Sequence, residues 1–360
     1  MQNGSESESG ERRAGRRSAL TLVAIVAVAG TIGIVVSFGQ RSPAAPPVPT
    51  ATAPARITPS PVPAEPEVGT SFAVADDLAT REVVLFGGED DGDNTWLWNR
   101  TRWTLARPPN RPPGRFGASA AYDPATQTVL LFGGRTEDGT AVADTWSWDG
   151  TDWNELDGGT DGPAPGEGSD IAWDAAQRQM VLVIGSGGAG TGATWIWAGT
   201  HWRRVAGGSL PAAWFYSPMW SDPVTGSLTA VGCCTSPPPA SGAVESTWQW
   251  NGSAWRQLAT SHDAPLDGST MALDPSLGRL VLCSCGYVEP QKPEPELSVW
   301  SGRNWAVMPI AHLPVQGGTV ITDLDRGQLL LLGSPVLETA SSPAPVQVWS
   351  LAGSSWHRLD

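Results

Sequence analysis

The apolar and polar positions of this chain repeat along its length in one order. An apolar run ends in a Gly pair, a polar turn follows, and then come Trp-x-Trp and one more Trp five residues on. The clearest copy is VLLFGGRTEDGTAVADTWSWDGTDW at residues 129–153. Five further copies of the same order lie at residues 83–103, 180–202, 228–255, 280–305 and 329–356. The pattern therefore divides most of the chain into six similar units.

The six units are evenly spaced. Consecutive units lie 49 to 53 residues apart, measured between the tryptophans Trp98, Trp148, Trp197, Trp250, Trp300 and Trp349. A unit of this size cannot bury its own apolar face, so neighbouring units must stack on one another. The sequence thus predicts a repeat architecture.

Each unit predicts four antiparallel strands. A short apolar strand comes first, and an aspartate then begins a hairpin turn, at Asp77, Asp123, Asp174, Asp222, Asp274 and Asp323. The second strand is apolar on both faces, as expected of a strand between two neighbouring sheets. The Gly pair ends it where a side chain would not fit. The third strand carries Trp-x-Trp, whose rings share one face, and the fourth carries the last Trp.

Several short motifs resemble those of a known repeat family. They are LFGG at residues 85–88 and 131–134, Pro112-Pro113-x-Arg115, and the Trp-x-x-Leu endings at Trp103 and Trp153. Together with four strands in about 50 residues, they resemble the blade of kelch-repeat β-propellers of the galactose oxidase and kelch-like group. The resemblance covers residues 68–360 and implies an all-β, six-bladed kelch-like propeller. Each unit holds its own four strands, which leaves open how the first blade joins the sixth.

Residues 1–38 have a different character. Residues 1–17 are polar and end in four arginines, and residues 18–38 are apolar and carry no charge. About 20 such residues span a bilayer as a helix, and arginines in front of it place that end in the cytoplasm. We therefore predict a cytoplasmic tail at residues 1–17 and one transmembrane helix, an uncleaved signal anchor, at residues 18–38. A cleaved signal peptide, which would give a secreted protein, is the alternative.

Residues 39–67 are rich in Pro and Ala and contain little that can be buried. Such a segment is an extended, semi-rigid linker. The propeller at residues 68–360 would then lie outside the cytoplasm, anchored to the cell membrane through the N-terminal helix. Abundant Ala, Gly, Pro and Arg, with Lys292 as the one lysine, resemble the composition of proteins from high-GC bacteria.

The net charge of −14 argues against nucleic acid as a partner, because the chain lacks the clustered basic residues that neutralise phosphates. The nineteen tryptophans mostly belong to the repeat, and side chains placed alike in six units serve packing between blades rather than sugar binding. Trp214, Phe215, Tyr216 and Trp220 stand outside the repeat, before and within the first strand of the fourth unit. They predict a ligand-binding surface, with Arg115 at the corresponding place of the second unit. Filling of the central channel is the alternative.

The four cysteines occur in two adjacent units. Cys233 and Cys285 hold equivalent positions, with Cys234 and Cys283 beside them. Outside the cytoplasm this arrangement predicts a disulfide between the fourth and fifth blades. Free packing thiols and a metal site are the alternatives, and the metal site ranks last because the spacing differs from Cys-x-x-Cys.

The sequence indicates no catalytic centre, metal site or cofactor. EDDGDN at residues 89–94 lacks the ordered ligand spacing of a calcium loop and is typical of a solvated turn. The copper site of galactose oxidase requires a Tyr-Cys cross-link, which Tyr122, Tyr216 and Tyr287 do not recreate in readable order. The histidines are scattered along the chain, at His201, His262, His312 and His357.

These observations predict a non-catalytic binding module outside the cytoplasm that presents a monomeric propeller to a protein partner. A cell-surface glycan-binding protein is the first alternative. An enzyme with a site at the propeller channel, a hydrolase, lyase or oxidase, is the second.

Overall fold

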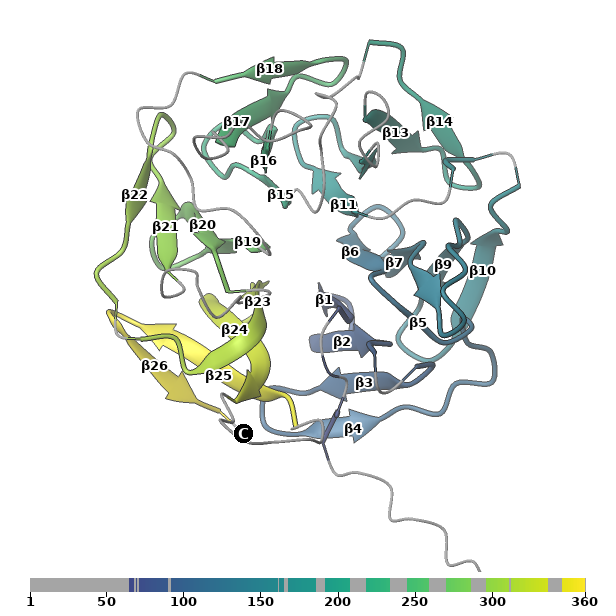
Figure 1. The fold of residues 1–360 in the computed structure, drawn as a ribbon, viewed down its shortest axis with the longest axis horizontal. Coiled ribbons are helices and arrows are strands. Elements are labelled where there is room, and N and C mark those ends of the chain that lie inside the picture. The colour runs from purple at the N-terminus through teal and green to yellow at the C-terminus, as the bar shows by residue number, and fades with distance from the viewer. Residues whose placement is uncertain are drawn as a thin grey trace, which may run out of the picture. The chain divides into compact units, whose positions relative to one another are not determined.

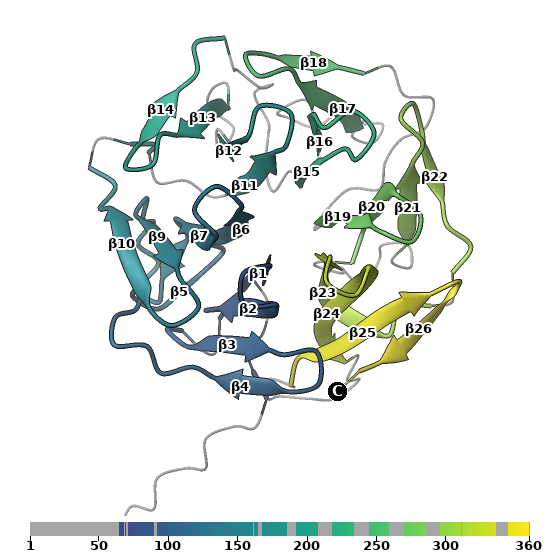
Figure 2. The same cartoon turned by 180° about the vertical axis from the view of Figure 1, so that it is seen from behind.

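The computed structural model describes residues 65–360 except residues 68, 70, 90–91, 161, 165–167, 186–191, 208–217, 234–244, 259–269, 286–295, 311, 336–344 and 360. They form six sheets of four strands each, arranged as blades around a central axis (Figure 1), and Figure 2 shows the same ring from behind. The prediction of a six-bladed all-β propeller is confirmed. The predicted membrane span at residues 18–38 lies outside the described part, within which no helix is long and apolar enough to cross a membrane.

The strands of the first three blades follow the predicted order. Blade 1 contains β1 (Ala73–Asp77), β2 (Glu82–Phe86), β3 (Thr95–Trp98) and β4 (Trp103–Leu105). Blade 2 contains β6 (Ser119–Asp123), β7 (Thr128–Phe132), β9 (Thr145–Trp148) and β10 (Trp153–Asp157). A small separate sheet joins β5 (Arg115–Phe116) to β8 (Arg135–Thr136). Blade 3 contains β11 (Ser169–Asp174), β12 (Gln179–Ile184), β13 (Ala193–Trp197) and β14 (Trp202–Arg204).

The last three blades repeat this arrangement. Blade 4 contains β15 (Met219–Ser221), β16 (Leu228–Cys233), β17 (Glu245–Trp250) and β18 (Trp255–Gln257). Blade 5 contains β19 (Thr270–Asp274), β20 (Arg279–Cys283), β21 (Leu297–Trp300) and β22 (Trp305–Val307). Blade 6 contains β23 (Val315–Asp323), β24 (Gln328–Pro335), β25 (Gln347–Ala352) and β26 (Ser355–Arg358). In every blade the first strand lies nearest the axis and the fourth lies at the outer edge (Figure 1).

The aspartate of each unit begins the first hairpin, as the sequence predicts. Its carboxylate accepts a hydrogen bond from the backbone N–H two or three residues ahead, as Asp77 does from Ala79 at 2.9 Å and Asp323 does from Arg326 at 3.1 Å. All six aspartates are buried. A buried carboxylate that accepts backbone N–H bonds fixes the turn and is itself stabilised by those bonds.

The core lies between the blades. Six clusters of buried apolar side chains each combine two adjacent blades, and all their members come from residues 72–359. The clusters therefore join all six blades without a side chain from residues 1–59. Within five blades the tryptophan of the third strand packs on that of the fourth, with ring centroids 5.1 to 5.4 Å apart. The prediction that the repeated tryptophans serve packing is confirmed.

Four of the interfaces between adjacent blades, here called seams, share one buried hydrogen bond. The indole Nε1–H of the fourth-strand tryptophan donates to the threonine hydroxyl that precedes Trp-x-Trp in the preceding blade. The pairs are Trp153 with Thr95, Trp202 with Thr145, Trp255 with Thr194, and Trp305 with Thr247, at 2.8 to 2.9 Å. The repeat thus supplies each of these seams with the same directional contact inside an apolar cluster.

The ring closes between blade 6 and blade 1 by a different contact. The Arg100 guanidinium, in the outer turn of blade 1, donates to Asp323 of blade 6 at 3.0 and 3.2 Å and to Asp76 at 2.6 Å. All three side chains are almost completely enclosed. The backbone N–H of Val346 also donates to the carbonyl of Pro66 at 2.8 Å. An ion pair and the entering N-terminal segment therefore close the ring, with no strand exchanged between the termini.

The two faces of the ring differ in their connections. The first and third connections of each blade are tight turns of two to six residues, such as residues 78–81 and 99–102. Because neighbouring strands run antiparallel, these turns share one face, called the turn face. The other connections are seven to fourteen residues long, such as residues 133–144, and form the loop face.

Candidate ligand-binding face

The loop face has the variable surface that a binding protein requires. Its long connections stand on strands whose apolar side chains are buried between the blades, so the base of each loop is rigid. Within residues 71–359, all residues outside the described part belong to these connections. The connections that follow β2, β4 and β7 are almost fully described, and the candidate site is built from them.

An open depression of about 540 Å³ lies on this part of the loop face. Its lining contains Asp93 from the connection after β2, Pro113 and Gly114 from the connection after β4, and residues 136–138 from β8 and the turn after it. Asp93 forms an exposed salt bridge with Arg111 at 2.9 Å. Exposed pairs of this kind contribute little stability and exchange readily with water or ligand.

The lining of the depression is acidic, because it contains the carboxylates of Asp93, Glu137 and Asp138. Asp138 accepts hydrogen bonds from the Thr136 hydroxyl at 2.6 Å and from the Thr140 N–H at 3.0 Å. These bonds, the one from Thr136 first, lower the pKa of Asp138 and hold it ionised. Ionised carboxylates only accept hydrogen bonds, so the depression suits a ligand that presents hydroxyl, amide or cationic donors.

Arg115 supports this depression from below. Its side chain is fully buried and makes a bidentate ion pair with Asp144, with 2.8 Å between Nη2 and Oδ2, and also donates to the carbonyls of Pro113 and Gly133 at 3.0 Å. Its main chain pairs with Gly88 and Gly92 of the preceding blade. The sequence predicts Arg115 as a ligand-contacting residue. Its placement corrects that role, because an enclosed and paired guanidinium has no access to a ligand.

The Gly pair of the LFGG motif is explained by the same contact. A Cβ added to Gly87 would lie 2.3 Å from the carbonyl oxygen of Arg115, and Gly87 has a φ of +71°. No side chain fits at that distance, as the sequence predicts. The Gly pair thus allows the Arg115 segment of blade 2 to cross over the end of β2.

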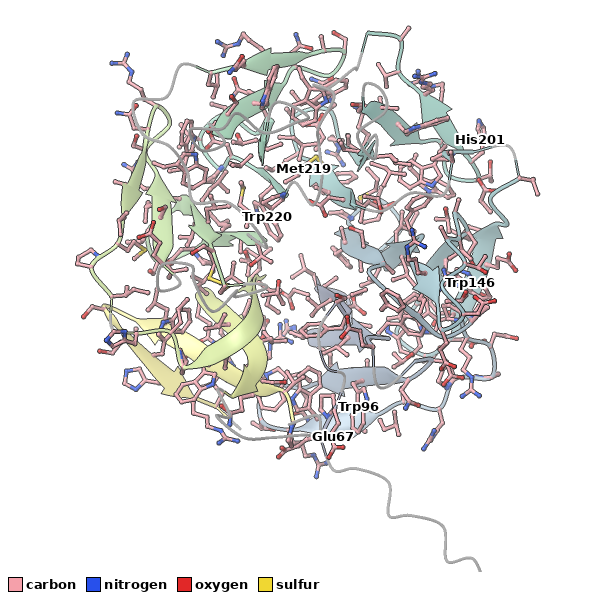
Figure 3. All side chains as sticks on the ribbon, in the orientation of Figure 1. Glu67, Trp96, Trp146, His201, Met219 and Trp220 are labelled. Atoms are coloured by element: carbon pink, nitrogen blue, oxygen red, sulfur yellow. A yellow bond between two sulfur atoms is a disulfide. The ribbon has the colours of Figure 1, made fainter. Side chains whose placement is uncertain are left out.

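The predicted aromatic cluster is only partly within the described residues. Trp214, Phe215 and Tyr216 lie outside them. Trp220 is in β15, near the centre of the ring (Figure 3), and is partly buried against the cluster between blades 4 and 5. Its ring therefore takes part in packing, and the prediction of an aromatic ligand surface rests on residues 214–216.

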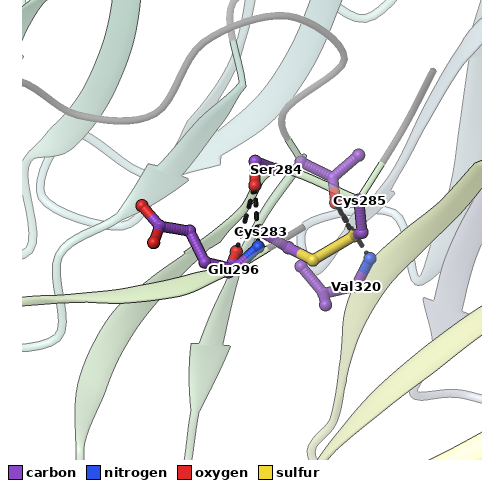
Figure 4. The surroundings of a disulfide bond; sticks show 6 residues. Cys283, Ser284, Cys285, Glu296 and Val320 are labelled. Atoms are coloured by element: carbon purple, nitrogen blue, oxygen red, sulfur yellow. Dashed lines mark hydrogen bonds between the residues drawn. A yellow bond between two sulfur atoms is a disulfide. The ribbon is translucent and has the colours of Figure 1, made fainter. Parts of the chain in front are cut away.

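The disulfide differs from the predicted one. Cys283 and Cys285 are joined within blade 5, with their Cα atoms 5.1 Å apart (Figure 4). The predicted link between blades 4 and 5 is thus wrong for these two cysteines. The physical reason is local, because β20 ends at Cys283 and the chain turns, which brings the second cysteine within bridging distance. Cys234 lies outside the described residues, and Cys233 is the last residue of β16.

One acidic side chain of blade 3 bonds to both neighbouring blades. Asp170, in β11, accepts hydrogen bonds from the Ser119 hydroxyl at 3.0 Å, the Ile171 N–H at 3.0 Å and the Met219 N–H at 2.8 Å. Burial raises the pKa of Asp170 to about 7, against the opposite effect of these bonds. It ties together the innermost strands of blades 2, 3 and 4, which is a structural task.

The described residues contain no group of three or more metal-ligating side chains. Asp90 and Asp91 of the EDDGDN turn are outside them. His201 is exposed in the outer turn of blade 3 and His357 is exposed on β26 of blade 6, so these two histidines belong to different blades.

Comparison with known proteins extends this description. No family model matches the chain. No curated protein matches it either. Among solved structures, that of YjhT aligns with a TM-score of 0.53 and 12% identity over 83% of this chain and 99% of that one. The SapL1 lectin in complex with alpha methyl fucoside aligns with a TM-score of 0.53 and 14% identity, over 81% and 95%. At these identities the likeness shows the propeller fold and no more.

Sequence reasoning did not single out Glu137 and Asp138. A signal was present, because the second unit inserts the polar stretch RTEDGTAVAD between its Gly pair and TWSW, at residues 135–144. The corresponding stretch of the first unit, residues 89–94, is shorter. An extra hairpin on a repeat whose other parts are fixed marks the place where the unit has acquired a surface of its own.

Proposed function

We propose that this protein is a non-catalytic binding module, tethered to the cell membrane by residues 18–38 and displayed outside the cytoplasm on the linker at residues 39–67. The loop face of the propeller contacts a protein partner. The observation that carries the proposal is the contrast between the two faces, with turns of two to six residues on one and connections of seven to fourteen on the other. Long connections on a rigid frame are where binding proteins place their contacts.

The acidic depression is the described part of this contact. Asp93 lies on the connection after β2, Glu137 and Asp138 both lie on the connection after β7, and the Arg115 ion pair fixes the bases of these connections. A partner segment with backbone amides or basic side chains would satisfy these carboxylates. Rim-exposed charges of this kind raise the association rate and the specificity more than the affinity.

Site-specific photo-cross-linking on intact cells tests this proposal. A photo-reactive amino acid is introduced into the full-length protein at Glu137 or Thr140 of the loop face, and at Glu155 on the outer strand β10 as a control. All three positions are exposed. One recurrent protein should cross-link from positions 137 and 140 and not from 155. Equal cross-linking from all three, or partner capture from 155 alone, would contradict a loop-face site.

A cell-surface glycan is the second candidate ligand. The specific observation is that one solved structure with this fold is a lectin bound to alpha methyl fucoside. In the sequence, Trp214, Phe215 and Tyr216 are aromatic residues in the connection before β15, and aromatic rings commonly stack on the apolar faces of sugars.

The glycan candidate requires Trp214 and not Trp220, because Trp220 packs between blades. Retention of the purified propeller on cell-wall polysaccharide should be lost in Trp214→Ala and kept in Glu137→Gln. Retention that survives Trp214→Ala, or a propeller that is never retained, would exclude this candidate and leave the protein partner.

A further inference from the structure

The turn face carries a second candidate interaction surface, independent of the loop face. Four large apolar side chains are exposed among the described residues: Val224, Leu277, Val307 and Leu324. Three of them, at 81%, 45% and 46% exposure for Val224, Leu277 and Leu324, stand in the first turns of blades 4, 5 and 6. Single exposed apolar residues are ordinary, whereas three in the same turn of consecutive blades form a surface.

These turns lie next to one another around the channel. The turn of blade 3 bonds to that of blade 4 through the Ala176 N–H and the Gly226 carbonyl at 2.9 Å. The turns of blades 6 and 1 meet in the salt bridge between Asp325 and Arg81 at 3.5 Å. The apolar side chains therefore belong to one continuous ring of turns.

Exposed arginines surround the apolar side chains. Arg326 follows Leu324 in the same turn, and Arg279 is the first residue of β20, two positions after Leu277. Arg81 stands in the adjacent turn of blade 1, and Arg303 stands in the outer turn of blade 5. The carboxylates of the same turns are those of Asp325, which pairs with Arg81, of the half-buried Glu82, and of the buried hairpin aspartates Asp77, Asp274 and Asp323. We call this surface the basic-apolar patch, made of Arg81, Leu277, Arg279, Arg303, Leu324 and Arg326.

The exposed arginines of this patch are positively charged, whereas the protein as a whole has a net charge of −14. The acidic depression lies on the opposite face, while the hairpin aspartates of the turn face are buried and Asp149 and Asp152 lie in the outer turn of blade 2. An anionic partner is therefore attracted to the exposed arginines of the patch and repelled from the acidic depression.

We propose that the basic-apolar patch docks on an anionic lipid surface. Leucines at the tips of adjacent turns enter the headgroup layer, and the arginines beside them pair with lipid phosphates. This combination is typical of interfacial membrane binding. The patch consists of projecting turns, and a deformable headgroup layer accepts projecting side chains without a complementary groove. Docking in this way leaves the loop face directed away from the lipid.

Vesicle sedimentation tests the inference with the propeller unit, residues 60–360, whose buried clusters join all six blades. Phosphatidylcholine vesicles are compared with vesicles that also contain about 30% phosphatidylglycerol. The propeller should bind the anionic vesicles at low salt, bind them weakly at about 0.5 M salt, and not bind phosphatidylcholine alone. Equal binding to both kinds of vesicle, or no binding at low salt, would overturn the proposal.

Matched variants locate the contact. Arg303→Ala and Leu277→Ser should each weaken binding about fivefold, and the double variant about 20-fold. Arg204→Ala is the control, because Arg204 is an exposed arginine on the outer strand of blade 3. If Arg204→Ala weakens binding as much as Arg303→Ala, the patch is not the contact. If instead the lipid-free propeller self-associates and Arg303→Ala makes it monomeric, the occupant is a second copy and the lipid proposal fails.

Discussion

The seam that closes the ring differs from the four seams that join blades 1 to 5. Each of the four has a tryptophan Nε1–H that donates to a threonine hydroxyl. At the closing seam Val346 stands in place of that threonine, and the indole of Trp103 has no hydrogen-bond partner among the described residues. Arg100 and its two carboxylates supply the directional contact instead. Closure therefore replaces a repeated neutral bond with a single buried ion pair.

The backbone of Arg100 shows that this replacement has a cost. The four corresponding outer-turn residues are Gly150, Gly199, Gly252 and Gly302, with φ between +88° and +95°, and Arg100 itself has a φ of +69°. A side chain in this left-handed region costs about 1–2 kcal/mol. Arg100 tolerates that strain because its guanidinium reaches Asp323 across the seam. The comparison teaches that four seams follow from the repeat, whereas closure depends on a residue that departs from it.

The largest expected effect comes from removing the closing ion pair. Arg100→Gly restores the residue of the other blades and relieves the backbone, but it leaves the buried carboxylates of Asp76 and Asp323 without their cation. The free energy of unfolding should fall by about 3 kcal/mol. Urea denaturation followed by tryptophan fluorescence measures the change.

Arg102→Gly is the matched control, because Arg102 is exposed in the same turn and its loss should change stability little. The double variant Arg100→Gly with Asp76→Asn should recover part of the loss, since it removes one of the unpaired charges. Equal stability of Arg100→Gly and Arg102→Gly would show that the ion pair does not hold the ring closed.

A smaller effect is expected at an ordinary seam. Thr145→Val keeps the shape of the side chain and removes the acceptor for Trp202 Nε1, which lies 2.8 Å away. The buried donor is left unsatisfied, and the free energy of unfolding should fall by about 1–2 kcal/mol. Thr229→Val is the control, because the Thr229 hydroxyl is also buried but has no hydrogen-bond partner in the described part of the chain. If both variants lose the same amount of unfolding free energy, the hydrogen bond between Trp202 and Thr145 is not the cause of the loss.

The reverse change should stabilise the closing seam. Val346→Thr places a hydroxyl where the other four blades have one, in the same cluster as Trp103. The unpartnered indole then gains an acceptor, and the free energy of unfolding should rise by about 0.5–1 kcal/mol. Val348→Thr, two residues further in the same cluster, buries a hydroxyl without that benefit and should be destabilising. If the free energy of unfolding falls in both variants, the Trp103 indole does not reach the side chain at position 346.

The last prediction concerns the pH dependence of the seams around Asp170. Burial raises its pKa to about 7 from the ordinary value of 3.8, so the folded state binds a proton more tightly than the unfolded state. Its contribution to stability is fully present below about pH 4 and is lost as the pH rises to about 7. Asp170→Asn should flatten that part of the curve of unfolding free energy against pH. Curves of wild type and variant that run parallel between pH 4 and 7 would show that Asp170 does not titrate there.

Much of the fold could be predicted from particular residues. The six hairpin aspartates and the Gly pair at residues 87–88 stand where local backbone demands are strict, so their chemistry can be interpreted without knowledge of neighbours. The burial of the repeated tryptophans followed from their equivalent places in every unit. Less of the candidate site was predictable, because Glu137, Asp138 and Asp93 meet only through connections of different blades.

Two predictions failed for the same reason. Arg115 stands in a polar loop and reads as exposed, yet Asp144 and the crossing of the preceding blade enclose it. Cys233 and Cys285 hold equivalent positions in blades 4 and 5, which suggested a disulfide between the blades. The turn after β20 instead brings Cys285 to Cys283. In both cases the partner was determined by a local bend or by a contact between loops. The periodicity of the sequence predicts neither.

The sequence by itself determined the number of blades, their four strands, the turns that begin at aspartate and the burial of the tryptophans. Each of these depends on interactions within one unit or on a rule common to all units. Only the tertiary structure decided how the ring closes, where Arg115 points, and that exposed arginines and leucines gather in the turns of blades 5, 6 and 1. Those features arise between residues far apart in the chain, such as Arg100 and Asp323, and they exist only when the six blades are set side by side.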